Sequence, residues 1–183
     1  MLLNAKKLAF LGLLLAVTVV LIILSGVFEF NTLFLLAAAS FGVGIAIRES
    51  NIRIGAGFYL AAILVSMMLA PNKLYIITFS AMGLYILIIE YAFDKLTHLQ
   101  WKPLGSSVSN RSRVYWILKF TVFNLMYLPM LILLPKLIYP GELKGIILAL
   151  HLLGGQVALF LFDTAYRYFQ GTVWGKIRNK LQL

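Results

Sequence analysis

Long apolar segments constrain this chain more than any other feature of its sequence. Residues 8–28 form an uncharged run of 21 residues, and about 20 apolar residues span the hydrocarbon core of a bilayer. This run is longer than the apolar region of a signal peptide, which has about 7 to 15 residues, so we expect it to be retained as a helix. The sequence predicts an all-α integral membrane protein forming a single membrane domain, residues 1–183, with transmembrane helices at residues 8–28, 32–47, 54–70, 74–93, 114–134 and 145–162.

Composition supports a membrane protein. Hydrophobic residues make up 62% of the chain and charged residues 12%, which leaves too little polar surface to cover a water-soluble globule of this size. The net charge of +10 comes mostly from residues just beyond the apolar runs, where anionic lipid headgroups would meet them. We therefore expect contacts with membrane lipid and no nucleic-acid partner. The absence of cysteine excludes disulfides and thiolate metal sites.

The distribution of basic residues predicts the orientation of the helices. The polar loop at residues 94–113 carries four basic residues and one acid, and Lys and Arg near membrane segments are strongly biased to the cytoplasm. With this loop inside, both termini and the tail at residues 163–183 are also cytoplasmic. Only Lys73, Lys136 and Lys144 then lie outside, and the other 13 of the 16 basic residues lie at or near the cytoplasmic face.

Charged and small residues within these segments predict local packing. Ala, Gly and Ser dominate residues 37–46, which indicates a central helix that packs closely against its neighbours. Glu49 and Arg53, like Asp163 and Arg167, are four residues apart, the spacing of a helical ion pair. Lys119 lies near the inner end of its helix, from which its long side chain can extend to the interface.

Catalytic patterns are weak in this sequence. The only two histidines, His98 and His151, are predicted on opposite faces of the membrane, which argues against a histidine metal site. The sequence has no phosphate-binding glycine loop. We therefore expect no enzymatic activity, no cofactor and no metal.

A stripe of small residues follows one side of the first predicted helix. Ala5, Ala9, Gly12 and Ala16 project within about 60° of one another at helical spacing. Such a surface lets another helix approach closely. That helix belongs either to this chain, as internal packing, or to a partner protein that docks here.

The chain as a whole resembles the S-components, the substrate-binding membrane subunits of energy-coupling factor (ECF) transporters. The similarity lies in six helices within fewer than 200 residues, a basic start followed by the small-residue stripe, short outside loops and a basic tail. Three stretches carry it in detail: FNTLFLLAAASFGVGIAIRE at residues 30–49, LAPNKLY at 69–75 and HLLGGQVALFLFDTAYRYF at 151–169.

This resemblance implies an S-component-like bundle, a set of partners and a docking face. In that family an alanine-rich motif on helix one contacts a transmembrane coupling subunit, which sits on two ATPase subunits. The residues that match this motif are Ala5, Ala9, Gly12 and Ala16. The chain departs from the pattern at Gly12, where alanine is more usual, and by placing Lys6 and Lys7 within the first small-residue element.

The resemblance also implies that a small, vitamin-like substrate binds near the outer face of a bacterial cytoplasmic membrane. Three outside lysines against two outside acids suggest an anionic ligand. The candidate substrate-binding residues lie at the third hairpin, on the last two helices and in the last outside loop: Asn72, Lys73, Tyr75, Thr78, Tyr127, Lys136, Tyr139, Glu142, His151 and Gln156.

Two other classes remain open. A non-catalytic membrane scaffold, for example in cell-wall synthesis, would use the small-residue stripe for stable partner binding and would have no ligand pocket. A self-sufficient channel or carrier would normally show a polar stripe along a helix. The inner halves of the predicted helices lack one, with Lys119 and Glu90 expected near the interface, which argues against a continuous pore.

Overall fold

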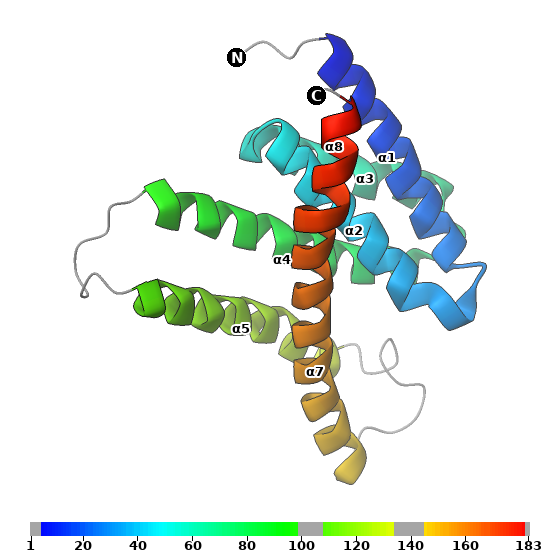
Figure 1. Ribbon diagram of the computed structural model, residues 1–183. Helices are drawn as coiled ribbons and strands as arrows, with labels where there is room; N and C mark the ends of the chain where they lie inside the picture. The colour runs from blue at the N-terminus through cyan, green and yellow to red at the C-terminus, as the bar shows by residue number, and fades with distance from the viewer. Residues whose placement is uncertain (1–4, 99–107, 134–144, 182–183) are drawn as a thin grey trace. The chain divides into compact units, whose positions relative to one another are not determined.

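The computed structural model describes residues 5–98, 108–133 and 145–181, and within these ranges it contains helices and no strand (Figure 1). Six helices are long and apolar enough to cross a membrane, which confirms the predicted all-α architecture with six membrane-spanning helices. The helices are α1 (Ala5–Ser25), α2 (Thr32–Glu49), α3 (Ile52–Leu69), α4 (Lys73–His98), α5 (Val108–Leu133) and α7 (Ile146–Tyr168).

Short helical segments extend two of these elements. A 3₁₀ turn, η1 (Glu29–Asn31), precedes α2, and a π-helical segment, η2 (Phe169–Trp174), joins α7 to α8 (Gly175–Leu181). Residues 163–181 of the predicted polar tail are therefore helical. Helices α4 and α5 also extend into the predicted loop at residues 94–113, because polar residues end the membrane-spanning stretch without ending the helix.

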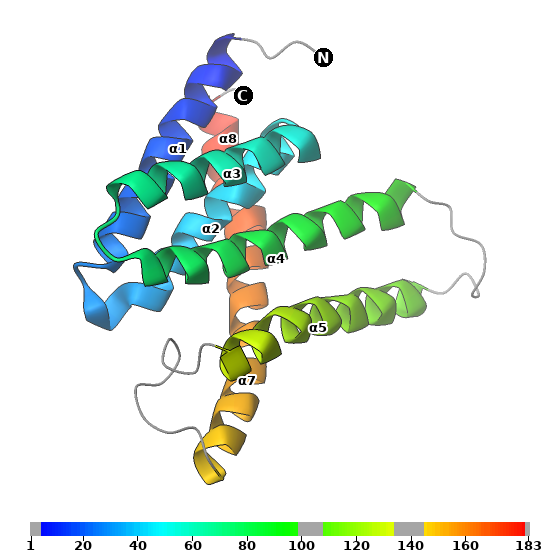
Figure 2. The same cartoon turned by 180° about the vertical axis from the view of Figure 1, so that it is seen from behind.

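The chain divides into two compact units, which are described separately. Unit 1 comprises Met1–Ala92 with Tyr168–Leu183, and unit 2 comprises Phe93–Arg167. In unit 1, α1, α2 and α3 pack on one another, as Figures 1 and 2 show from opposite sides. Helix α4 adds Ile76 and Phe79 to the same hydrophobic core.

Helix α2 occupies the centre of unit 1, as its small residues predict. It is the most buried of the six long helices. At Gly42 an added Cβ would lie 2.5 Å from Thr18 Oγ1 of α1, and at Gly55 of α3 it would lie 2.2 Å from Ile47 Cγ1 of α2. Glycine at these two positions allows the neighbouring helices to approach α2 closely.

Unit 2 contains the end of α4, most of α7 and all of α5. Trp116 of α5 stacks on Phe160 of α7 with ring centroids 6.1 Å apart. Tyr127 of α5 fits against Gly155 of α7, where an added Cβ would lie 2.5 Å from Tyr127 Cε1. These contacts show that α5 and α7 pack against each other with their chain directions opposed.

Candidate functional site

The small-residue stripe on α1 faces away from the core of unit 1. Ala5, Ala9, Gly12 and Ala16 are all exposed, and nothing lies within 4 Å of a Cβ built at Gly12. The buried residues of the same helix are Leu11, Thr18, Val19, Ile22 and Ser25. At about 100° per residue, four of these five positions centre on the far side of the helix from the stripe, and only Val19 projects toward the stripe's side, beyond its last residue. The described part of unit 1 therefore does not use the stripe for internal packing.

The candidates at the α3–α4 turn have local partners within unit 1. Asn72 Oδ1 accepts a hydrogen bond of 3.0 Å from the Leu74 amide. Lys73 Nζ donates to the carbonyl oxygens of Met67 and Ala70 at the end of α3, where a cation complements the helix dipole. These contacts give Asn72 and Lys73 a role in shaping the turn.

Two further candidates, Tyr75 and Thr78, lie on α4 and are half-buried. Tyr75 is half-buried and packs against the core of unit 1, and its ring lies 3.5 Å from a Cβ built at Gly26. Thr78 is also half-buried, one turn further along α4. Both side chains therefore lie next to the core and are not fully open to solvent.

Three other candidates come together at the α5–α7 interface of unit 2. Tyr127 Oη donates a hydrogen bond of 2.8 Å to the carbonyl oxygen of His151. His151 Nδ1 lies 2.8 Å from the Ile147 carbonyl oxygen, and since a carbonyl only accepts, Nδ1 carries the hydrogen of this bond. Gln156 exchanges two hydrogen bonds with Asn124, of 2.9 and 3.4 Å. The sequence predicted these residues singly, and the structure groups them.

The remaining substrate candidates, Lys136, Tyr139 and Glu142, lie outside the described residues. The others are divided between the two units: Asn72, Lys73, Tyr75 and Thr78 belong to unit 1, and Tyr127, His151 and Gln156 belong to unit 2. The three candidates of unit 2 lie together in the polar group on α5 and α7.

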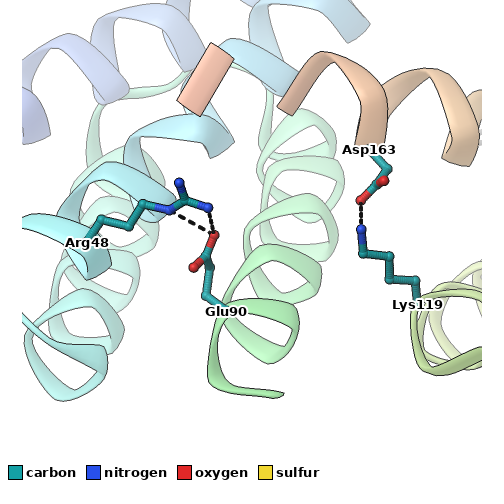
Figure 3. Close-up of polar contacts among 4 residues, drawn as sticks. All are labelled: Arg48, Glu90, Lys119 and Asp163. Atoms are coloured by element: carbon teal, nitrogen blue, oxygen red, sulfur yellow. Dashed lines mark hydrogen bonds and ion pairs between the residues drawn. The ribbon is translucent and has the colours of Figure 1, made fainter. Parts of the chain in front are cut away.

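A buried ion pair extends this polar interface along α5 and α7 (Figure 3). Lys119 Nζ lies 2.5 Å from Asp163 Oδ1, and both side chains are almost fully buried, at 2% and 1% exposed. Arg167 Nε lies 3.1 Å from Asp163 Oδ2, which confirms the ion pair predicted from their spacing. The position of Lys119 in the sequence predicted that its side chain extends to the membrane–water interface. It instead stays buried, because Asp163 offers it a partner there.

Hydrogen bonds thus bridge α5 and α7 at three levels: Tyr127 with the backbone carbonyl of His151, Asn124 with Gln156, and Lys119 with Asp163. On the predicted orientation, Lys119 with Asp163 lies in the inner half of these helices, Asn124 with Gln156 near the middle, and Tyr127 with His151 in the outer half. The inner half therefore contains a buried ion pair that the sequence did not predict. At each level the polar groups bond across the two helices. The arrangement joins α5 to α7 and is not evidence for a pore.

Unit 1 contains two further charge contacts that the sequence did not predict. Arg48 donates to Glu90 Oε1 from Nε at 3.1 Å and from Nη2 at 2.7 Å (Figure 3). Buried Glu49 accepts a 3.0 Å hydrogen bond from Trp174 Nε1 and pairs with Arg178 Nε at 3.1 Å. The second contact holds the C-terminal segment on α2.

The predicted Glu49–Arg53 pair is wrong because the helix breaks between these residues. Helix α2 ends at Glu49, and Asn51 caps the start of α3 through a 2.9 Å hydrogen bond from the Ile54 amide to its Oδ1. A signal for the actual contacts did exist, since charged groups beside apolar spans require partners. The sequence did not predict which residues are the partners, because Glu90 is 42 residues from Arg48 and Trp174 is 125 residues from Glu49.

Among the residues that the structure describes, no group of three or more His, Asp or Glu side chains could hold a metal ion. Comparison of the chain with protein families, with characterised proteins and with solved structures finds no match.

Proposed function

We propose that this protein is the substrate-binding S-component of an ECF-type ABC importer. It resides in the bacterial cytoplasmic membrane with both termini inside and captures a small, vitamin-like and anionic micronutrient at the outer face. It releases this substrate inward when docked on a coupling subunit that carries two ATPases. The chain itself is not an enzyme, and its partners supply the energy for transport.

The position of the α1 stripe is the observation that carries this proposal. A surface formed by Ala5, Ala9, Gly12 and Ala16 allows an approaching helix to reach the backbone of α1. The stripe is exposed and points away from the core of unit 1. If the stripe served internal packing, another helix of unit 1 would cover it. None of the described helices of that unit does, so we propose that a helix of the coupling subunit packs there.

The polar group on α5 and α7 supports the ligand-binding part of the proposal. Tyr127, His151, Asn124 and Gln156 bring hydroxyl, imidazole and amide groups to one pair of membrane-spanning helices. Polar groups within membrane helices are costly and frequently mark substrate sites. We propose that this group contributes hydrogen bonds to the substrate.

Affinity purification of the tagged protein from its host in mild detergent tests the proposal directly. We expect mass spectrometry to identify a membrane coupling subunit, two ATPases and a bound small molecule. Recovery of cell-wall enzymes without any ATPase would instead favour the alternative, a non-catalytic scaffold that uses the same face of α1 for stable assembly.

A pair of tryptophan variants tests the docking face. Gly12→Trp fills the stripe without meeting any protein atom near its Cβ, so we expect folded protein that no longer copurifies with the coupling subunit. Val17→Trp is the matched control, because Val17 is also exposed on α1 but projects about 100° away from Ala16. Equal recovery of the coupling subunit with both variants would contradict the docking role.

A further inference from the structure

The guanidinium group of Arg167 is held in a fixed position in unit 2 while part of it stays accessible. Its Nε lies 3.1 Å from Asp163 Oδ2, and its side chain is 54% exposed. Its central carbon lies 5.6 Å from the centre of the Trp116 ring, a distance typical of a cation–π contact. Two contacts thus hold the group beside Asp163 and Trp116 without enclosing it.

Arg167 retains hydrogen-bonding capacity in this position. Asp163 Oδ2 has no aligned hydrogen bond within the described residues, so the contact with Arg167 is an ion pair of charges and not a directed bond. A guanidinium has five N–H donors in a planar fork, which matches the oxygens of a phosphate. In the described part of the chain, none of these donors makes an aligned hydrogen bond to protein.

The charge around Asp163 also favours an additional anion. Its single carboxylate pairs with Lys119 through Oδ1 and with Arg167 through Oδ2. Lys119 is the closer partner, at 2.5 Å against 3.1 Å, and it is also the buried one. One negative charge is therefore shared by two cations, and it neutralises the more exposed Arg167 less than it neutralises Lys119.

Both helices that carry this site also expose apolar side chains. Ile117 and Phe120 of α5 are 66% and 52% exposed, and Phe160 and Leu161 of α7 are 56% and 61% exposed. Phe160 stacks directly on Trp116, so the aromatic platform under Arg167 continues into this surface. In a membrane-spanning pair of helices, such a surface contacts acyl chains, and Trp is typical of the interface with the headgroups.

We propose that Arg167 and Trp116 form a binding site for the phosphate of an anionic phospholipid. The guanidinium fork binds the phosphate oxygens, Asp163 and Trp116 hold the fork in position, and the acyl chains lie along Ile117, Phe120 and Phe160. Basic groups between membrane helices near the surface are a known way to bind anionic headgroups. This site does not depend on the transport function proposed above.

Native mass spectrometry of the delipidated full-length protein, with added phosphatidylglycerol or phosphatidylcholine, tests this inference. We expect the wild type to bind phosphatidylglycerol at least about fivefold more tightly than phosphatidylcholine, since one cation near a membrane surface gives roughly a fivefold preference. R167Q should lose this preference. R53Q, the matched control at an exposed arginine of unit 1, should keep it.

A second variant protects the test against a loss of folding in R167Q. R167K keeps a positive charge opposite Asp163 but lacks the planar fork, so we expect it to bind phosphatidylglycerol with an affinity between those of the wild type and R167Q. Unchanged affinity in R167Q, or in R167K where R167Q does not fold, would overturn the site. Displacement of phosphatidylglycerol by millimolar inorganic phosphate would overturn the lipid as its ligand and leave a site for the free anion.

Discussion

Buried charge is the dominant feature of this protein at the scale of single residues. Lys119 and Asp163 lie 2.5 Å apart and are nearly inaccessible, and Tyr115 and Trp116 place their rings 4.4 and 5.1 Å from the ammonium group. Removing two charges from water is costly, and their attraction compensates only with good geometry and further contacts. Here the aromatic rings and Arg167 supply those contacts.

This arrangement predicts unequal effects of single and double substitutions. Asp163→Asn removes the negative charge opposite Lys119 and should lower the free energy of unfolding by about 3–5 kcal/mol. The double variant Lys119→Met with Asp163→Leu leaves neither charge buried. It should therefore lower the free energy of unfolding by less than Asp163→Asn does. Thermal unfolding in detergent measures both, and a double variant that is less stable than Asp163→Asn would contradict this account.

Sequence spacing identified the ion pairs only where both partners share a helix. Asp163 and Arg167 are four residues apart within α7, so helical geometry alone brings them together. The ion-paired Lys119 and Asp163 are 44 residues apart. The carboxylate of Glu49 accepts a hydrogen bond from Trp174, which is 125 residues away. Both contacts therefore depend on how the helices pack. A sequence shows that such charges need partners, but tertiary packing determines which partners they obtain.

At the scale of helices, glycine positions determine how closely neighbours approach. Hydropathy predicted every long helix, because length and apolar composition are local properties. It did not predict the exact ends: α3 begins at Ile52, two residues earlier than expected, because Asn51 caps it. Nor did it distinguish Gly154 from Gly155, which are adjacent but occupy different environments.

The two adjacent glycines of α7 offer a matched test of the α5–α7 interface. Gly155→Ala places a Cβ 2.5 Å from the Tyr127 ring, which forces the two helices apart or displaces the ring. We expect a loss of about 1–3 kcal/mol in the free energy of unfolding. Gly154→Ala meets no atom within 4 Å and should be neutral or stabilising by up to about 1 kcal/mol, as alanine favours a helix.

Thermal unfolding of the two alanine variants checks this prediction. Tyr127→Ala should cost less stability in the Gly155→Ala background than in the wild type if the clash is the cause, because the clash is then relieved while the loss of the Tyr127 contacts is the same in both backgrounds. Equal melting temperatures for Gly154→Ala and Gly155→Ala would show that α5 and α7 do not pack as described.

At the scale of the whole molecule, the sequence predicted the membrane-spanning character but not a complete site. Six apolar helices follow from composition, whereas the substrate candidates came from many separate segments and the structure groups only part of them. Tyr127, His151 and Gln156 meet on α5 and α7 because these helices pack with opposed directions. That relation is a property of the folded chain, and no spacing in the sequence encodes it.

Orientation in the membrane is the molecule-scale property on which the proposed function depends most. The bias of 13 basic residues over three predicts the α3–α4 turn outside and the C-terminal segment inside. The chain contains no cysteine, so single cysteines report on their own positions, and the cysteine-free wild type is the control. In intact cells, a membrane-impermeant maleimide should label Lys73→Cys, and it should label Lys176→Cys only after permeabilisation. Labelling in the reverse pattern would place the turn with Asn72 and Lys73 in the cytoplasm, where those residues would be unable to receive a substrate from outside.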